Sequence, residues 1–521
     1  MQDFPLNLHH IVWRIEKLFA RKEIATLRDS GMHRISYGEM ALRARKLATV
    51  LQNLGVRQGD CVATLAWNNW RHLELYFAVP CIGGVLHTLN LRLSPEQLTF
   101  IANDAKDTVV FVDESLAPLL DRFVRDVPSI RRVVVLGDEY EQLIAGAEPL
   151  REWPAVDENA PMAMCYTSGT TGHPKGVVYS HRSQFLHAMG VSQSAALGLL
   201  ESDVVLPIVP MFHANAWGLP YACGMIGASF VLPDRFMGDA EAMIQLAMNE
   251  GVTILSGVPT IWVGVAQKLA GRKLPKVRKV FCGGSAIPRA LMKAMDGESL
   301  TMVQAWGMTE TSPVATVALP RSWQDGDLLD IRTTQGPPVP CVELRICDLD
   351  SGVELPWDGV AFGEIQVRGP WVCSGYHNAA DATRMTSDGW FRTGDVATVS
   401  PDGFVSIVDR AKDVIKSGGE WVSSVELENA IMAHPKVLEA CVIGVPHEKW
   451  QERPVAYVVP RGEHRDSICA DEILDHLSQH FMKWWLPDEV RFIDEVPKTS
   501  VGKFDKKVLR ARAEPLAQAD R

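Results

Sequence analysis

Tyr166-Thr-Ser-Gly-Thr-Thr-Gly-His-Pro-Lys-Gly-Val177 joins four Ser and Thr hydroxyls, three glycines and one lysine within a single short segment. Glycine allows backbone amides to approach a ligand closely, hydroxyls donate hydrogen bonds, and a lysine adds a positive charge. A loop that serves only solvation does not need this combination. We therefore predict a loop that binds phosphate oxygens, with the candidate ligands Thr167, Ser168, Gly169, Thr170, Thr171, Gly172 and Lys175.

The segment differs from the ordinary P-loop. That motif places Gly-Lys-Ser/Thr at the start of a helix, whereas here Lys175 follows Pro174 and precedes Gly176. No helix is expected to begin at this lysine. The segment instead resembles the phosphate-binding signature of the adenylate-forming (ANL) superfamily, which contains acyl-CoA synthetases, adenylation domains of peptide synthetases and firefly-type luciferases.

Length and composition indicate the general class of protein and exclude some kinds of partner. The 521 residues are too many for one compact core, and 47% hydrophobic with 22% charged residues is typical of a soluble globular protein. A net charge of -11 without a basic run argues against a nucleic-acid partner. Ten cysteines lack a Cys-x-x-Cys pair, and neither a signal peptide nor an integral membrane segment is apparent. We expect a cytoplasmic protein, and a homodimer is compatible with the sequence.

Hydrophobic periodicity predicts an α/β fold. Residues 38–54 carry a helical apolar stripe that Gly55 ends. Short β-rich runs with helical segments between them indicate largely parallel sheets; these runs cover residues 61–66, 108–112, 132–136, 204–208, 253–255 and 277–281. With the resemblance, we expect two such sheets in the large domain. Residues 342–367 and 403–408 suggest a β-barrel-like subdomain. We place a large N-terminal adenylation domain at 1–409 and a small, mobile α+β C-terminal domain at 410–521.

The segment Gln304-Ala-Trp-Gly-Met-Thr-Glu310 resembles a second ANL motif. The resemblance implies that Thr309 contacts the α-phosphate of ATP and that Glu310 holds Mg²⁺, a hard cation that prefers carboxylate oxygen. It also implies that Gly307 and Met308 line the junction between the nucleotide and the acyl group. Trp306 is assigned by the same resemblance to the ATP site.

Two further segments resemble nucleotide-binding motifs of the superfamily. Gly283-Gly-Ser-Ala286 matches the segment that packs on the adenine, which makes Gly284, Ser285 and Ala286 candidate ligands. Thr393-Gly-Asp395 matches a motif in which the aspartate, here Asp395, accepts the ribose hydroxyls. Arg410 is implied as a second ribose contact.

The C-terminal part carries the remaining motifs. In Arg410-Ala-Lys-Asp413 the resemblance makes Lys412 the interdomain hinge. The loop that follows is implied to line the tunnel for coenzyme A, because glycine leaves room for a thiol arm; its residues are Ser417, Gly418, Gly419, Glu420 and Trp421. In Pro497-Lys-Thr-Ser-Val-Gly-Lys-Phe-Asp505, Lys503 matches the lysine that contacts carboxylate and phosphate during adenylation.

The segment that is most informative about the carboxylic acid substrate is Pro210-Met-Phe-His-Ala-Asn-Ala-Trp217. Amino-acid-activating relatives have an aspartate where this chain has His213, so an ammonium group would lack its counter-charge. The run resembles medium- and long-chain fatty acyl-CoA synthetases, in which a tryptophan at the position of Trp217 gates the acyl tunnel; the alternative is a simple core residue. Trp306 stands where many relatives have tyrosine and is expected to shorten the cavity. The candidate acyl-pocket residues are His213, Trp217, Gly284, Trp306 and Gly307.

We therefore predict an ATP-dependent carboxylic acid:CoA ligase that forms an acyl-AMP intermediate and releases AMP and pyrophosphate, on short- or medium-chain fatty acids. The implied cofactors and partners are ATP, Mg²⁺, coenzyme A and a small carboxylic acid. The candidate catalytic residues are His213, Thr309, Glu310 and Lys503. Three alternatives remain: a ligase for 3-methylmercaptopropionate from the same branch, an acyl-AMP ligase that loads a carrier protein, and a luciferase-like oxygenase.

Overall fold

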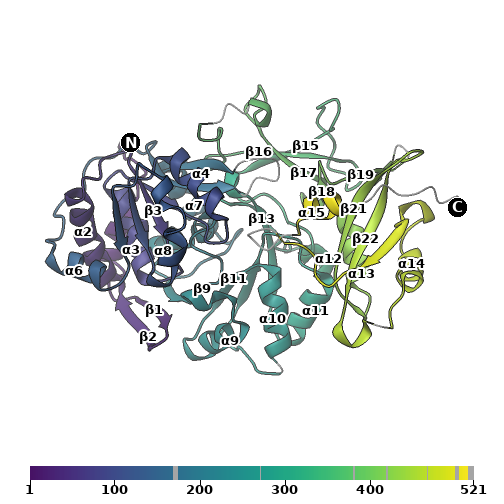
Figure 1. Cartoon of the computed structure of the whole chain (residues 1–521), viewed down its shortest axis with the longest axis horizontal. Coiled ribbons are helices and arrows are strands. Elements are labelled where there is room, and N and C mark those ends of the chain that lie inside the picture. The colour runs from purple at the N-terminus through teal and green to yellow at the C-terminus, as the bar shows by residue number, and fades with distance from the viewer. Residues whose placement is uncertain are drawn as a thin grey trace.

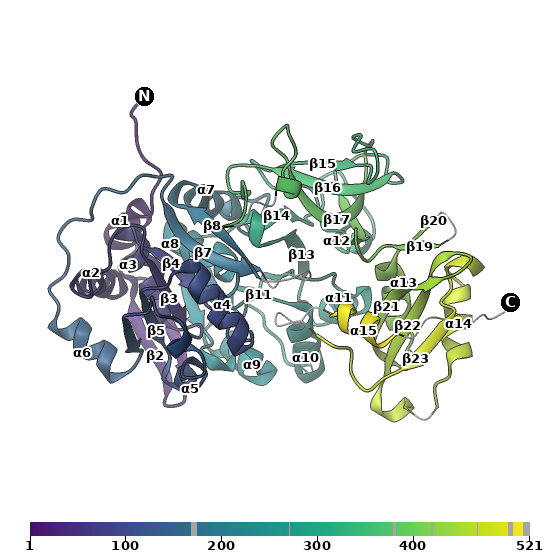
Figure 2. The same ribbon diagram turned by 45° about the horizontal axis from the view of Figure 1, so that its top comes forward.

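A computed structural model describes residues 1–167, 174–269, 271–378, 382–417, 420–465, 467–498 and 504–513 of the chain (Figure 1). Two large sheets form the N-terminal part. A small antiparallel sheet lies beside them, and the C-terminal domain follows at the far end of the long axis. Figure 2 shows the antiparallel sheet between the body of the N-terminal part and the C-terminal domain.

The first sheet has eight strands within the described residues, and its central strands are parallel. Antiparallel strands close both edges. In spatial order the strands are β14 (Val314–Val317), β13 (Met302–Gly307), β12 (Lys279–Cys282), β11 (Ile254–Gly257), β9 (Val204–Pro207), β10 (Ser229–Leu232), β1 (Glu23–Arg28) and β2 (Gly31–Ser36).

The second sheet has six strands in the part of the chain that the structure describes. All neighbours are parallel except the last pair, which forms a hairpin. In spatial order the strands are β6 (Arg132–Val135), β5 (Val109–Val112), β3 (Cys61–Leu65), β4 (Val85–Thr88), β7 (Pro161–Thr167) and β8 (Lys175–Ser180).

Two smaller sheets complete the fold. The antiparallel sheet runs in chain order through β15 (Glu343–Cys347), β16 (Phe362–Arg368), β17 (Phe391–Val399) and β18 (Val405–Arg410). The sheet of the C-terminal domain contains β20 (Glu420–Val422), β19 (Ile415–Ser417), β22 (Gln451–Pro460) and β21 (Val437–His447), and β23 (Glu489–Phe492) pairs with β22.

Helices cover these sheets. In the N-terminal part they are α1 (His9–Lys17), α2 (Tyr37–Asn53), α3 (Trp70–Cys81), α4 (Pro95–Ala105), α5 (Ala117–Leu120), α6 (Asp138–Gly146), α7 (His181–Ser192), α8 (Leu219–Ile226), α9 (Ala240–Asn249), α10 (Pro259–Leu269), α11 (Arg289–Gly297) and α12 (Leu329–Arg332). In the C-terminal domain they are α13 (Ser424–Met432), α14 (Ala470–Ser478) and α15 (Lys506–Arg512).

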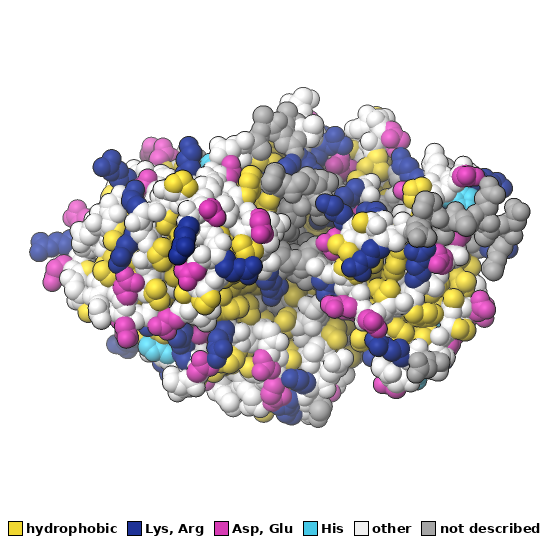
Figure 3. All heavy atoms as spheres, in the orientation of Figure 1, with side chains coloured by type: hydrophobic (Ala, Val, Ile, Leu, Met, Phe, Trp, Pro, Cys, Tyr) yellow, Lys and Arg dark blue, Asp and Glu magenta, His cyan; other side chains and the backbone are white. Residues whose placement is uncertain are grey.

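Local sequence explains why these elements form where they do. Helix α2 begins after Ser36, whose hydroxyl accepts a hydrogen bond from the Glu39 amide, and its apolar stripe is buried. Strands β3 and β5 are buried along their whole length, as expected for parallel strands covered on both faces. Over the face shown in Figure 3, basic and acidic side chains are interspersed.

The expected fold class is confirmed: two mainly parallel sheets, an antiparallel subdomain and a C-terminal α+β domain are all present. The expected barrel-like region is an open four-stranded sheet rather than a closed barrel among the described residues. Helix α2 spans Tyr37–Asn53, one residue earlier at each end than the expected range 38–54. The domain boundary at residue 410 remains a prediction, and β18 ends at that residue.

The stripe of α2 gives a matched test of the core. Leu47 is fully buried, whereas Leu42 on the same helix is 48% exposed. We expect Leu47→Ala to lower the free energy of unfolding by about 2–5 kcal/mol, because it removes buried methyl groups and leaves a cavity. Leu42→Ala should change it by less than about 0.5 kcal/mol. Chemical unfolding followed by circular dichroism measures both, and equal effects would contradict the assignment of the buried face.

Candidate active site

The predicted phosphate loop connects two paired strands. Strand β7 ends at Thr167 and β8 begins at Lys175, and these two residues are partners in the antiparallel register. No helix begins at Lys175, as expected from Pro174 and Gly176, and the residue instead opens a strand. The predicted ligands Ser168, Gly169, Thr170, Thr171 and Gly172 lie outside the described residues.

The base of this hairpin is tightly anchored. The Tyr166 hydroxyl donates to Asp104 Oδ2 (2.7 Å), and its ring lies 5.1 Å from the ring of His87. A Cβ on Gly176 would lie 3.0 Å from the Tyr166 ring and 3.1 Å from His377 Cβ. Glycine at position 176 therefore lets β8 approach the segment that contains His377.

Lys175 and Glu310 are joined through a residue that the motifs do not contain, Tyr376. The Tyr376 hydroxyl donates to Glu310 Oε1 (2.6 Å), and Lys175 Nζ lies 4.9 Å from the centroid of the Tyr376 ring. Glu310 itself is buried. The candidate phosphate lysine and the candidate metal carboxylate, far apart in sequence, thus contact one side chain.

The end of β13 is a tight turn that presents Thr309 and Glu310. A Cβ on Gly307 would collide with the Pro313 carbonyl, so only glycine fits there. The Met308 amide donates to the Pro313 carbonyl (3.1 Å), and a single turn of 3₁₀ helix follows at Thr309–Thr311. The Tyr179 hydroxyl donates to the Thr309 carbonyl (2.8 Å). Backbone contacts therefore fix the turn before any ligand arrives.

Three candidate nucleotide ligands meet at β17. Asp395 pairs with Arg410 in the β17–β18 register, and their side chains form an ion pair, Arg410 Nε to Asp395 Oδ1 at 2.6 Å. The indole N–H of Trp306 donates to Asp395 Oδ2 (2.9 Å). This hydrogen bond places the Trp306 indole next to the candidate ribose ligand. That Trp306 shortens the acyl cavity remains a prediction.

The adenine and acyl segments also lie together. Gly284 has φ +89°, in the left-handed region that favours glycine, and with Ser285 and Ala286 it connects β12 to α11. A Cβ at Gly283 would lie 3.2 Å from Cη2 of Trp217. The Trp217 indole therefore packs against the backbone of the predicted adenine segment.

Trp217 belongs to an unusual left-handed turn that follows His213. The five residues Ala214–Gly218 all have positive φ, between 44° and 72°, and only the last is a glycine. Left-handed backbone costs roughly 1–2 kcal/mol for each non-glycine residue. Such a turn persists only where its surroundings hold it in place. His213 and Trp217 are both half-buried at this turn.

Side chains from the second sheet and its helices hold the left-handed turn. The Met211 amide donates to Asn68 Oδ1 (2.7 Å), and the Tyr76 hydroxyl donates to the Met211 carbonyl. The Cys165 thiol donates to Asn215 Oδ1 (3.2 Å). Beneath Gly218 lies the buried His187, whose pKa burial lowers to about 3, so its imidazole is neutral at pH 7.

The candidate hinge leads from β18 to β19. The Asp413 and Val414 amides both donate to the Arg410 carbonyl (2.8 Å), which folds the chain into a turn around Lys412. Asp413 pairs with Arg510 of α15 (2.6 Å). Burial lowers the pKa of the Lys412 ammonium. The turn thus contacts α15 of the C-terminal domain on one side and the candidate ribose ligand Arg410 on the other.

The predicted coenzyme A loop lies between β19 and β20. Ser417 and Glu420 pair across this hairpin, and Ser417 Oγ accepts a hydrogen bond from the Arg453 guanidinium (2.9 Å). Trp421 follows in β20. Gly418 and Gly419, like Lys503, lie outside the described residues.

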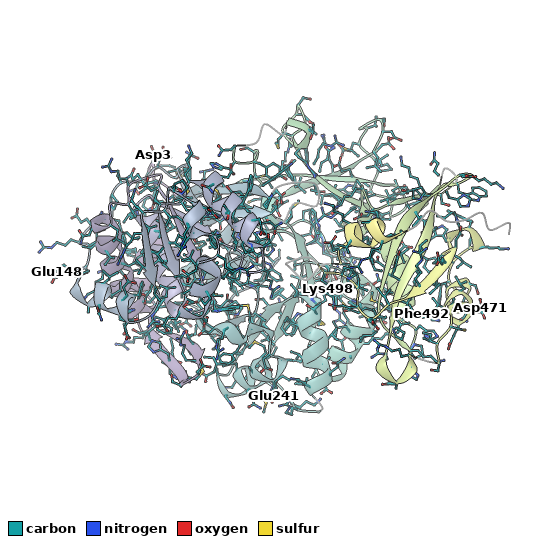
Figure 4. The ribbon with its side chains drawn as sticks, in the orientation of Figure 1. Asp3, Glu148, Glu241, Asp471, Phe492 and Lys498 are labelled. Atoms are coloured by element: carbon teal, nitrogen blue, oxygen red, sulfur yellow. The ribbon has the colours of Figure 1, made fainter. Side chains whose placement is uncertain are left out.

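Lys503 belongs to a segment whose two described ends are paired. Lys498 and Phe504 form an isolated antiparallel bridge. Figure 4 labels Lys498 between the N-terminal body and the C-terminal domain, and its Nζ contacts Glu439 Oε1 at 2.7 Å.

Sequence reasoning missed several residues that build this site. Tyr376, Tyr179, Asn68 and Tyr76 each contact a motif residue or its backbone, and His187 lies beneath Gly218 at the end of the left-handed turn, yet none of the five lies in a motif. Nothing in the sequence marks their partners, because every contact crosses from one element to another. A buried-position pattern could have found His187, a polar residue on the buried side of α7.

Comparison with known proteins identifies the family of the chain. The family described as AMP-binding enzyme matches residues 18–377, and the family described as AMP-binding enzyme C-terminal domain matches residues 426–503. The ATP-bound crystal structure of MatB from Rhodopseudomonas palustris superimposes with a TM-score of 0.86 at 28% identity, covering 98% of this chain and 99% of that one. The chain belongs to the AMP-binding enzyme family.

Curated relatives define the activity class. A long-chain-fatty-acid–CoA ligase of Thermus thermophilus is 46% identical over 98% of this chain and 96% of its own length. A 3-methylmercaptopropionyl-CoA ligase of Ruegeria lacuscaerulensis is 42% identical, with 98% of each chain covered, and a medium-chain-fatty-acid–CoA ligase of Ectopseudomonas oleovorans is 41% identical over 98% of this chain and 97% of its own length. The protein is an AMP-forming, ATP-dependent acid–CoA ligase. Among the helices described, none has the length and apolar character needed to cross a membrane.

The hydrogen bond from Trp306 to Asp395 can be tested directly. Trp306→Phe keeps an aromatic ring but removes the donor, and the loss of a hydrogen bond to a charged acceptor is worth about 1.5 kcal/mol, about tenfold. We expect the KM for ATP to rise by about that factor while the KM for CoA is unchanged. Steady-state kinetics measure both. A rise in the KM for the acid alone would contradict this and favour the acyl-pocket role.

Proposed function

We propose that this acid–CoA ligase acts on short- and medium-chain fatty acids. The observation that carries the proposal is the packing of Trp217 against the Gly283 backbone. A large indole on a left-handed turn fills space beside the candidate adenine segment, on the side where the carboxylate must approach the nucleotide. If the Trp217 indole closes the acyl cavity at this point, the cavity accepts short acyl chains better than long ones.

The relatives support this class and one alternative within it. Their names include long-chain and medium-chain fatty acids and 3-methylmercaptopropionate. A short thioether acid has a similar reach to a short fatty acid and carries no charge at the far end. We therefore keep 3-methylmercaptopropionate as the second candidate substrate.

The first half-reaction joins the acid to AMP. A carboxylate oxygen attacks the α-phosphorus, a new O–P bond forms, and the bond to the leaving pyrophosphate breaks. We assign Lys175 and the loop before it to the β- and γ-phosphates, Thr309 to the α-phosphate, and Asp395 with Arg410 to the ribose. Lys503 contacts the carboxylate and phosphate in this step.

Magnesium fits the residues at Glu310. No group of three or more His, Cys, Asp or Glu side chains among the described residues could hold a metal ion by itself. Mg²⁺ is commonly bound by one or two carboxylates together with substrate phosphates, and the buried Glu310 offers such a carboxylate. The ion would neutralise phosphate charge when bound.

The second half-reaction transfers the acyl group to CoA. We propose that the C-terminal domain rotates about Lys412, which withdraws Lys503 and presents the loop of Ser417, Gly418 and Gly419. The CoA thiolate then attacks the acyl carbonyl, the C–S bond forms, and AMP leaves with the electron pair of the broken C–O bond.

Two variants test this domain alternation, one at the candidate catalytic lysine Lys503 and one at the candidate hinge Lys412. Lys503→Ala should abolish pyrophosphate release yet still convert supplied acyl-AMP to thioester, because the lysine acts only in the first step. Lys412→Pro should do the reverse, because proline restricts φ at the pivot. Pyrophosphate release and thioester formation from acyl-AMP are measured separately. Equal loss of both half-reactions in either variant would contradict domain alternation.

A substrate screen with a gate variant tests the acid. Thioester formation is measured over C2 to C18 acids, aryl acids and thioether acids, with free CoA as the acceptor. We expect a maximum at short or medium chains, and we expect Trp217→Ala to move it toward longer chains. Trp323→Ala removes a tryptophan that is 67% exposed and should leave the profile unchanged. A C16–C18 maximum in the unsubstituted enzyme would overturn the chain-length proposal.

The same assay separates the remaining alternatives. Acylation of a phosphopantetheinyl carrier with no reaction on free CoA would identify an acyl-AMP ligase, and light or a decarboxylated product without CoA would identify a luciferase-like oxygenase. Cytoplasmic location and a homodimer remain predictions; fractionation and light scattering test them.

A further inference from the structure

The segment 371–378 crosses between the two charged motifs of the site. Its backbone is fixed at both ends: the Cys373 amide donates to the Glu310 carbonyl and the His377 amide donates to the Gly176 carbonyl, both at 2.8 Å. Ser312 Oγ donates to the Trp371 carbonyl (2.8 Å). The segment therefore holds β8 and the turn after β13 in a set relation to each other.

Tyr376 lies in the middle of this segment and contacts both motifs with its side chain. Its hydroxyl donates to Glu310 Oε1 (2.6 Å), and its ring faces the ammonium group of Lys175, 4.9 Å from the centroid. The hydroxyl is the donor in this contact, because an ionised carboxylate can only accept. The ring edge also meets Phe391 at the start of β17 (centroids 6.3 Å apart).

These contacts use different parts of one rigid side chain. The hydroxyl group restrains a carboxylate by a charge-assisted hydrogen bond, and the ring attracts an ammonium group through its π face. A phenol has few rotatable bonds, so the two charged groups are held at a constant separation. Such preorganisation lowers the entropic cost of binding, because the nucleotide does not have to order these two side chains.

We propose that Tyr376 is a positioning residue that sets Glu310 and Lys175 in register for the metal–triphosphate of MgATP. The assignment rests on the proposed roles of Glu310 and Lys175 in the first half-reaction. The hydroxyl orients the Glu310 carboxylate toward the metal, and the ring orients Lys175 toward the phosphates. No covalent step passes through Tyr376.

The two contacts can be removed one after the other. Tyr376→Phe keeps the ring and removes the hydroxyl; it should raise the Mg²⁺ concentration for half-maximal pyrophosphate release by about tenfold. By calorimetry the Kd for MgATP should rise similarly, while ATP binding in EDTA is unchanged because the ring still meets Lys175. Tyr376→Leu removes both contacts and should weaken ATP binding in EDTA as well.

Tyr140→Phe is the matched control. The Tyr140 hydroxyl donates to the buried Glu74 in the N-terminal part of the chain, so this change also removes a tyrosine–glutamate hydrogen bond. It should lower the melting temperature and leave the Mg²⁺ requirement unaltered. For Tyr376→Phe the conversion of supplied acyl-AMP to thioester and the KM for the acid should equal those of the unsubstituted enzyme.

A double-mutant cycle tests whether Tyr376 acts through Glu310 or only stabilises the local fold. On a Glu310→Gln background, Tyr376→Phe should have no further effect on MgATP binding. The proposal is overturned if Tyr376→Phe leaves the Mg²⁺ requirement unchanged, or if it weakens MgATP equally on both backgrounds. Failure of the unsubstituted enzyme to release pyrophosphate with any acid would instead overturn the proposed function.

Discussion

The close passage of Gly307 beneath the Pro313 carbonyl is the constraint on which the site depends. Because a Cβ cannot fit there, β13 turns within a few residues and its last side chains diverge. On one side of the turn, the Trp306 indole donates a hydrogen bond to Asp395. On the other side, Glu310 accepts a hydrogen bond from the Tyr376 hydroxyl. The turn thereby connects the candidate ribose ligand Asp395 with the candidate metal carboxylate Glu310.

The left-handed turn at Ala214–Gly218 is the second constraint, and it is held from outside. Four non-glycine residues adopt unfavourable φ angles, so the cost of several kcal/mol is offset by contacts from other elements. Asn68, Tyr76 and Cys165 supply hydrogen bonds to the turn or to the residues just before it. The shape of the candidate acyl segment is therefore set by residues of the second sheet and its helices as much as by the turn itself.

Much of the fold could be predicted from the sequence, and the candidate ligands could be named from it, because the signals for both are local. The stripe of α2, the apolar runs of β3 and β5, and the order of the motifs each lie within a short stretch. The resemblance named Asp395 and Arg410 as separate candidate ribose ligands, and the structure joins them in an ion pair in the β17–β18 register. Tyr376 could not be predicted, because its two partners lie 66 and 201 residues away and only packing unites them.

The same division holds for the candidate phosphate loop that first indicated the function. The sequence by itself determined the chemistry: hydroxyls, glycines and a lysine suited to phosphate, and a motif order that defines the family. Only the tertiary structure decided that Lys175 opens a strand beside Tyr376, that the Trp306 indole bonds to Asp395, and that Trp217 packs on Gly283. The reason is physical: residue type sets which interactions a side chain can make, whereas the partner is chosen when distant elements pack into one core.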